Sequence, residues 1–237
     1  MVGTRPQPRR RYHHGDLPSA LIAATRRMLE KAGPESISFR AIARQAGVSQ
    51  TAPYNHFSSK EHLLATLAAA GFRELETSQM VAIETPGTIV QKIEALGRAY
   101  VRFARRQPQL YRLMFGVGMS HWRARPEVET AKKASFEPLK TVVTTYLTKI
   151  GRNSDRAAEI AAVTGWAIAH GLSMLLIDGV LDVPDDDAET LTTQVTAWLA
   201  AGFESGARTV NKGRPAKRHK GDKPIHARER RSQKRRT

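Results

Sequence analysis

The 237-residue sequence contains no cysteine. Disulfides and zinc sites built on cysteine are therefore excluded, and the composition fits a reducing compartment. The sequence also lacks a run of about 18 apolar residues, the minimum for a membrane-spanning helix, so it predicts no membrane partner. No apolar segment follows the arginine-rich N-terminus, as a secretory signal would require. We therefore expect a cytoplasmic protein.

Acidic residues are few, and the excess of basic residues lies at the two ends of the chain. Residues 1–14 carry four Arg and no acid, and residues 211–237 carry twelve Lys or Arg against two acids. Subtracting these +4 and +10 from the formal total of +16 leaves +2 for residues 15–210. Such a distribution indicates a polyanionic partner, and neither end has the apolar face that membrane insertion requires. Nucleic acid is the expected partner.

Strand-like alternation is also missing, and the apolar residues of the body recur at helical spacing. The sequence therefore predicts an all-α fold of about nine helices. Asp16, Ser38 and Ser49 are placed to cap the first three helices, and Ser58-Ser59-Lys60-Glu61 matches a capping box for the fourth. The expected helices span about residues 17–32, 39–46, 50–57, 58–82, 89–103, 108–114, 139–150, 155–181 and 188–209.

The segment from Arg40 to Leu64 holds two short expected helices joined by a turn at Ala46-Gly47-Val48-Ser49. Neither helix is long enough to be stable alone, so both must pack on the first and fourth helices. Two short helices at a fixed steep angle are typical of the helix-turn-helix unit. Its second helix enters the DNA major groove with its N-terminal residues at the base edges.

Residues 12–72 resemble the DNA-binding domain of the TetR family of bacterial transcriptional regulators. The matching residues stand in the family's order and spacing: Ala23-Ala24, Gly33, Ser38-Phe39-Arg40-Ala41-Ile42-Ala43, Ala46-Gly47-Val48-Ser49, Tyr54-Asn55-His56-Phe57 and Ser59-Lys60-Glu61-His62-Leu63-Leu64. The body is similar to a TetR subgroup named for a Trp-His-Gly signature, which Trp166, His170 and Gly171 supply. The run from Pro108 to Phe115 also resembles that subgroup.

This resemblance implies a regulator, most often a repressor, that binds a palindromic DNA operator as a homodimer. Dimerisation would use a four-helix bundle of residues 155–181 and 188–209, and an unknown small-molecule effector would control DNA binding. The implied organisation is a basic N-terminal arm (1–14), a helix-turn-helix domain of three helices (15–63), a C-terminal helical regulatory and dimerisation domain (64–209), and a disordered basic tail (210–237).

The resemblance also indicates which side chains meet DNA. Gln50 and Thr51 would reach base edges, since Gln pairs with adenine and Thr offers a hydroxyl or contacts a thymine methyl. Tyr54 and His56 match family positions that contact phosphate, and Lys60 adds a charge at a helix start that already favours an anion. The expected DNA-contacting residues are Ser38, Arg40, Ser49, Gln50, Thr51, Pro53, Tyr54, His56 and Lys60.

Some of these positions have a purely structural alternative. Ser38, Ser49 and Ser58 would cap helices in any helical protein, and Tyr54 could pack against the core. Pro53 departs from the family, which has Leu, Ile or Val there. Its missing N–H removes an intrahelical bond, so we expect a 3₁₀ turn at the start of this helix.

Five residues of the C-terminal body are candidates for a ligand pocket: Tyr100, Phe103, Leu113, Trp166 and His170. Trp166 and His170 are four residues apart and share a helix face. That face could form a pocket wall or a dimer contact. Alternatively, His170 could be a hydrogen-bonded core histidine, with Trp166 filling space in the core.

In the C-terminal tail, Lys212-Gly213-Arg214-Pro215 resembles the core of an AT-hook, which lies in the minor groove of A·T-rich DNA. The alternative is a solvated charge run that attracts phosphate without sequence preference.

Enzyme signatures are absent, so no catalytic residue, cofactor or metal is expected. Gly116-Val117-Gly118 lacks the third glycine of a dinucleotide loop, and Gly171-Leu172-Ser173 lacks the following glycine of a nucleophile elbow. Asp185-Asp186-Asp187 more often caps a helix than binds a cation. The alternative to an effector-responsive regulator is an architectural, weakly sequence-specific DNA-binding protein without an effector, which a solidly packed C-terminal domain would favour.

Overall fold

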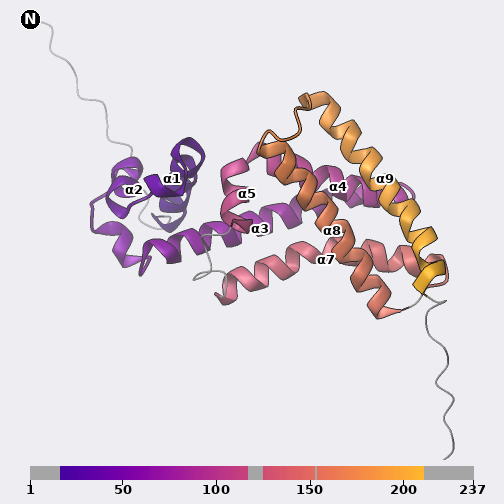
Figure 1. Cartoon of the computed structure of the whole chain (residues 1–237). Coiled ribbons are helices and arrows are strands. Elements are labelled where there is room, and N and C mark those ends of the chain that lie inside the picture. Colours follow the sequence, from indigo (N-terminus) through magenta and orange to yellow (C-terminus); the bar gives the residue numbers. More distant parts are fainter. Residues whose placement is uncertain (1–16, 117–124, 153, 211–237) are drawn as a thin grey trace, which may run out of the picture. The chain divides into compact units, whose positions relative to one another are not determined.

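The computed structural model describes residues 17–116, 125–152 and 154–210, and those residues form eight α-helices and two 3₁₀ helices without a strand (Figure 1). The predicted all-α fold is therefore confirmed. The described residues up to Glu204 form one compact unit. Asp16 and the candidate AT-hook Lys212-Gly213-Arg214-Pro215 lie outside the described residues.

The first two helices form where the sequence predicts them. Helix α1 spans Leu17–Ala32 and is followed by the 3₁₀ helix η1, Pro34–Ser36. Helix α2 spans Phe39–Ala46, and the Ser38 side chain caps it by accepting a 3.3 Å hydrogen bond from the Ala41 N–H. It ends at Gly47, which has a φ of 70°. Glycine adopts this left-handed conformation without steric cost, so the chain can turn sharply here.

The third helix differs from the prediction. Instead of an α-helix over 50–57, the chain forms a 3₁₀ helix, η2, over Ala52–Asn55. Backbone N–H groups of Tyr54 and His56 donate to the carbonyls of Thr51 and Pro53, each over 3.1 Å. The predicted cap at Ser49 is not formed, since its hydroxyl lies 3.2 Å from the Thr51 hydroxyl instead. Pro53 stands inside this short element and has no N–H to donate, which disfavours a longer α-helix.

The fourth helix, α3, spans Lys60–Glu84 and begins one residue later than the predicted capping box. Ser59, rather than Ser58, accepts the hydrogen bond from the His62 N–H, over 3.1 Å. Ser58 instead approaches the His62 ring, with its hydroxyl 3.2 Å from Nδ1. The helix continues without a break through the boundary expected between residues 63 and 64.

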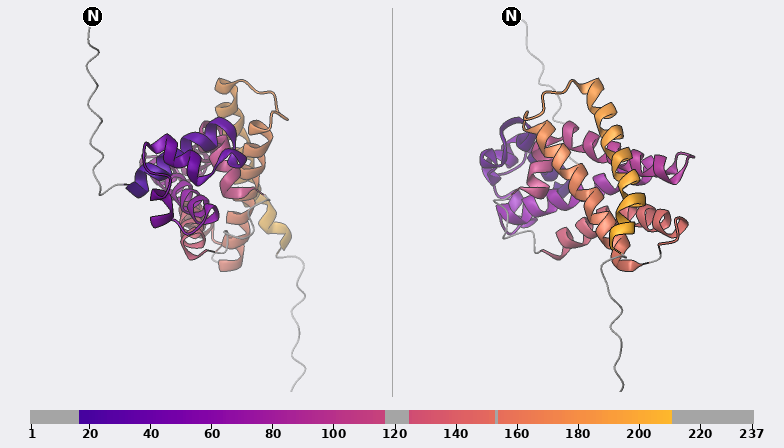
Figure 2. Two further views of the ribbon diagram at one scale, coloured as in Figure 1. Left: turned by 90° about the vertical axis from the view of Figure 1, so that its left-hand side faces the viewer. Right: turned by 45° about the vertical axis from the view of Figure 1, so that its right-hand side comes forward.

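Among the described residues, the body contains five further α-helices, seen in two more views in Figure 2. Helix α3 packs against α7 and α4, and α8 packs against α4 and α7. Gly97 on α4 allows α9 to come close, because a Cβ there would lie 2.5 Å from the Thr196 side chain. The helices are α4 (Ile89–Arg106), α5 (Pro108–Phe115), α7 (Pro126–Lys149), α8 (Asp155–Ile177) and α9 (Asp185–Val210).

Three of these helices have different limits from those expected. Helix α7 begins at Pro126 instead of about residue 139, because the chain stays helical through Pro138. Helix α8 ends at Ile177, before Gly179, rather than at residue 181. Helix α9 includes Asp185 as its first residue instead of following the three aspartates.

One hydrophobic core joins the N-terminal helices to α3, α4 and α5. It includes Leu21 of α1, Leu63 and Phe72 of α3, and Tyr111 of α5, each 1% exposed or less. A second core lies where α4, α7 and α8 meet, around Val143. The helix-turn-helix unit is therefore packed directly on the body rather than tethered to it.

Candidate functional site

The helix-turn-helix unit exposes a row of polar side chains. Of the nine residues expected to contact DNA, only Pro53 is buried and only Lys60 is half-buried. Gln50 and Thr51 lie immediately before η2, at the start of the element expected to face the base edges. The exposed residues are Ser38, Arg40, Ser49, Gln50, Thr51, Tyr54 and His56.

Tyr54 is both supported by the core and open to solvent. Its ring packs edge-on against buried Phe39, with the ring centroids 4.8 Å apart. The Tyr54 residue is nevertheless 62% exposed, so packing alone does not account for it. Pro53, by contrast, is buried under the turn and fixes its shape.

Positive charge lies on the same unit. Arg40 is exposed on α2 and Lys60 begins α3, where backbone N–H groups already favour an anion. Arg44, which was not among the expected DNA-contacting residues, is also exposed on α2. It stands four residues after Arg40 and thus on the same helix face, which is the signal that could have identified it.

A cavity of about 290 Å³ lies in the body, at the lower end of the range for small-molecule sites of about 300–1,000 Å³. Its wall is largely apolar and is built from α3, α4, α5, α7, α8 and α9. The apolar lining side chains include Phe72, Leu75, Ile93, Leu96, Phe115, Phe136, Leu139 and Leu199.

The five candidate pocket residues take different positions. Tyr100 and Trp166 line the cavity. His170 lies next to them but is not a lining residue; its Nδ1 is 2.6 Å from the Tyr111 hydroxyl. Phe103 and Leu113, 6% and 1% exposed, lie in the hydrophobic core away from the lining.

Several lining residues were not expected, and two of them left a signal in the sequence. Phe136 falls before the predicted start of its helix, although Phe136, Leu139 and Val143 continue the same helical spacing. Gln79 occupies a polar position on the buried stripe that includes Phe72 and Leu75. A polar residue in such a stripe needs a hydrogen-bond partner, and this need is the signal that distinguishes Gln79 from its neighbours.

Four side chains form a polar cluster beside the cavity. The Trp166 Nε1–H donates to the Tyr100 hydroxyl over 3.1 Å, and the Tyr100 and Tyr111 hydroxyl oxygens are 3.0 Å apart. Burial raises the pKa of the Tyr100 hydroxyl to about 12, and burial raises that of Tyr111 as well. Burial lowers the pKa of His170 below its usual 6.5. Burial therefore favours the neutral forms of Tyr100, Tyr111 and His170.

Acidification should destabilise this cluster. Because the His170 pKa is lower in the folded than in the unfolded protein, the unfolded state binds more protons once the pH drops below about 6.5. We expect the free energy of unfolding to fall between pH 7.5 and 5.5, and to fall less in His170→Asn. Urea denaturation at several pH values measures this difference. If the free energy of unfolding fell equally in the two proteins, the protonation of His170 would not be coupled to unfolding.

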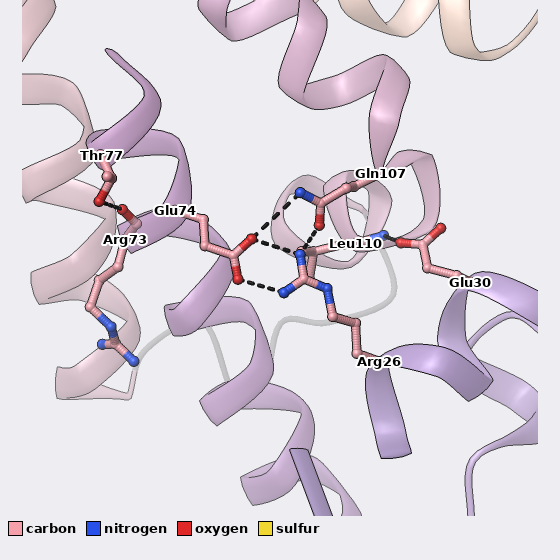
Figure 3. Close-up of polar contacts among 7 residues, drawn as sticks. All are labelled: Arg26, Glu30, Arg73, Glu74, Thr77, Gln107 and Leu110. Atoms are coloured by element: carbon pink, nitrogen blue, oxygen red, sulfur yellow. Dashed lines mark hydrogen bonds and ion pairs between the residues drawn. The ribbon is translucent and has the colours of Figure 1, made fainter. Parts of the chain in front are cut away.

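A polar contact ties α1 to α3 and to the start of α5 (Figure 3). Arg26 donates to both carboxylate oxygens of Glu74, over 2.5 and 2.6 Å, and also to the side-chain oxygen of Gln107. The Glu30 carboxylate accepts the Leu110 N–H over 3.0 Å, so α1 caps the first turn of α5. Because α5 carries Phe115, which lines the cavity, the helix-turn-helix unit is linked to the cavity wall.

Within the described residues, no group of three His, Cys, Asp or Glu side chains is placed to hold a metal.

Helix α8 is apolar and long enough to cross a membrane by length and composition alone, with a mean hydropathy of 1.8 over 18 residues. It packs against α4 and α7, as a helix of a folded body does.

Two family models match the chain. Residues 21–67 match the bacterial regulatory proteins of the tetR family, and residues 93–198 match the tetracyclin repressor-like C-terminal domain. The two matches together cover more than half of the chain. The first includes the exposed polar row, and the second includes most of the cavity wall.

Individual proteins agree with these matches. An uncharacterized HTH-type transcriptional regulator of Mycobacterium tuberculosis is 24% identical over 185 residues, 78% of this chain and 80% of that protein. A protein of unknown function from Rhodococcus sp. RHA1 has a similar structure, with a TM-score of 0.67 and 32% identity over 84% of this chain and 98% of its own.

A third similar protein shares the fold at lower identity. The transcriptional regulator FadR from Bacillus subtilis, solved in complex with stearoyl-CoA, has a TM-score of 0.64 and 16% identity, covering 78% of this chain and 98% of its own.

The family matches, the helix-turn-helix and its exposed polar row lead to one conclusion. The chain belongs to the tetR family of bacterial regulatory proteins and is a DNA-binding transcriptional regulator.

Proposed function

We propose that this protein is a cytoplasmic repressor that binds a palindromic operator as a homodimer and releases it when a small apolar or amphipathic molecule enters the cavity. The observation that carries the proposal is the set of exposed side chains of Gln50, Thr51, Tyr54 and His56 on a helix-turn-helix packed against the cavity-bearing body. In this proposal residues 15–63 bind DNA, residues 64–209 sense the effector and dimerise, and the basic ends (1–14 and 210–237) strengthen phosphate binding. Both expected modes of the tail, minor-groove binding and non-specific phosphate attraction, are compatible with this assignment.

Dimerisation is supported by the apolar surface of α8 and α9. Only 28% of the most apolar stretch of α8 is buried, and Ile160 and Val163 are 56% and 46% exposed. On α9, Trp198 is 83% exposed. Two copies that pair these helices would remove this surface from water and would present two recognition elements with the two-fold symmetry of a palindrome.

Effector control is supported by the cavity. A solidly packed body would favour the architectural alternative, whereas about 290 Å³ of apolar space is room for a small molecule. Bacillus subtilis FadR, which shares the fold, is described in complex with stearoyl-CoA, an amphipathic molecule. Trp166, which lines the cavity, and His170 beside it would then represent the Trp-His-Gly signature of a TetR subgroup.

The proposed DNA contacts predict different effects for two substitutions. After footprinting on DNA that flanks the protein's own gene, Gln50→Ala should weaken binding to the protected site by about 1–3 kcal/mol and relax preference at one base pair per half-site. Lys60→Ala should weaken binding to this site and to random DNA about equally, because a phosphate contact carries no sequence information. Fluorescence anisotropy at one fixed salt concentration measures both. If Gln50→Ala weakened the two DNAs equally, Gln50 would not read a base.

A further inference from the structure

The cavity wall contains a buried polar atom without a hydrogen-bond partner. Gln79 of α3 lines the cavity and is 4% exposed. Its side-chain oxygen, Oε1, is the buried side-chain N or O atom that lacks a partner among the described residues. A buried acceptor left in this state is unfavourable, so native proteins rarely keep one without a reason.

The other buried polar groups of the wall are already satisfied. The Ser135 hydroxyl donates to the Lys132 carbonyl over 2.8 Å, and the Thr196 hydroxyl donates to the Thr192 carbonyl over 2.8 Å. The Tyr100 hydroxyl accepts from Trp166 and lies 3.0 Å from the Tyr111 hydroxyl. Of the buried side-chain N and O atoms on this wall, Oε1 of Gln79 is the one that has no hydrogen-bond partner among the described residues.

Water does not readily fill this role. A buried water normally needs two to four polar partners. The apolar lining residues include Phe72, Leu75, Ile93 and Leu96, none of which can hydrogen-bond in its side chain. The apolar wall does supply contacts for a molecule with an apolar body. Such a molecule can therefore bring one donor to Oε1 at a lower cost in free energy than a single water can.

We propose that Gln79 makes the cavity selective for apolar molecules that carry a hydrogen-bond donor, such as a hydroxyl or an amide N–H. This inference rests on the proposed function, because it takes the cavity to be the effector site. Gln79 is then the specificity-determining residue: the apolar wall supplies affinity, and the amide oxygen rejects molecules of the same size that offer only acceptors or no polar group.

Two isomeric probes test this selectivity. 1-Nonanol and methyl octyl ether have the same atoms, but only the alcohol can donate a hydrogen bond. In isothermal titration calorimetry on the full chain, without DNA, we expect the alcohol to bind about tenfold more tightly than the ether, as one hydrogen bond to an otherwise unpaired acceptor allows.

Variants assign this preference to Gln79. Gln79→Met keeps the length of the side chain and removes the acceptor, so the alcohol and the ether should bind within about twofold of each other. Gln79→Leu also removes the acceptor and serves if Gln79→Met does not fold. Ser135→Ala is the matched control: it removes a lining hydroxyl that is already bonded within its own helix, so it should keep the preference for the alcohol.

The outcomes separate this inference from the proposed function. Equal affinity of the wild-type protein for the alcohol and the ether, or no binding of either isomer, would overturn the role of Gln79. A preference for the alcohol that survives both Gln79 variants would overturn it too. If the alcohol binds as expected but leaves operator affinity unchanged, the inference stands and effector control is wrong.

Discussion

Replacing Tyr111 by alanine is expected to lower the free energy of unfolding by about 3–5 kcal/mol, as for other large buried aromatic residues. Tyr111 is fully buried, and its ring lies 4.8 Å from that of Phe115 and 5.8 Å from that of Tyr100, between centroids. Alanine would leave a cavity in the main core and would remove a partner of His170. Urea denaturation of the full chain measures this loss.

Two other substitutions calibrate the result. Tyr111→Phe keeps the ring but leaves Tyr100 and His170 with one partner fewer, so a smaller loss of about 1–3 kcal/mol is expected. Val81→Ala changes a residue that is 59% exposed and should stay within about 0.5 kcal/mol of the wild type. If Tyr111→Ala lowered the free energy of unfolding by less than Tyr111→Phe does, the packing described for α5 would be contradicted.

A glutamate at position 198 is expected to convert the proposed dimer into a monomer and to weaken operator binding by about a hundredfold or more. Trp198 is 83% exposed on α9, whereas the next residue, Leu199, is 8% exposed, so the indole faces away from the core. Burying an unpaired carboxylate in an apolar contact between copies would be strongly unfavourable. A monomer would hold only one half-site, so the cooperative contribution of the second would be lost.

Sedimentation and DNA-binding measurements on the same samples test this expectation. Val81→Glu is the control, because Val81 is an exposed apolar residue on α3 rather than on α8 or α9. It should leave both the mass and the operator affinity unchanged. A Trp198→Glu protein that remains a dimer with full affinity would place the contact between copies elsewhere on the surface.

The sequence was sufficient to predict the fold and the location of the DNA-binding unit. Helical spacing located α1, α2, α4 and α5 closely, because each buries one clear stripe. Helices α2 and α4 also begin at a side-chain cap, and α5 begins at a proline. Spacing alone could not show that η2 would be a 3₁₀ helix throughout. That depends on how Pro53 and Ala52 fit against the core beneath them, and this is a tertiary effect.

The cavity was harder to predict. Aromatic residues and a signature motif led to Tyr100 and Trp166, which line it, but also to Phe103 and Leu113, which fill the core. A buried stripe looks the same in sequence whether its side chains meet protein or empty space. The outcome depends on the angles at which α7, α8 and α9 cross α3 and α4, and a pattern along a single helix carries no information about those angles.

The unbroken course of α3 has a mechanical consequence. Lys60 and Gln79 are nineteen residues apart on this helix, or about 28 Å at about 1.5 Å per residue. A tilt of α3 by about 5° about its cavity end would therefore displace Lys60 by about 2.5 Å, given that rise per residue. Hydrogen bonds to phosphate tolerate only a few tenths of an ångström. Since the Arg26–Glu74 ion pair joins α1 to α3, the whole helix-turn-helix unit would move together with α3. In the proposed homodimer, a molecule in the cavity would therefore need to tilt α3 only slightly to move both recognition elements away from their positions on the operator.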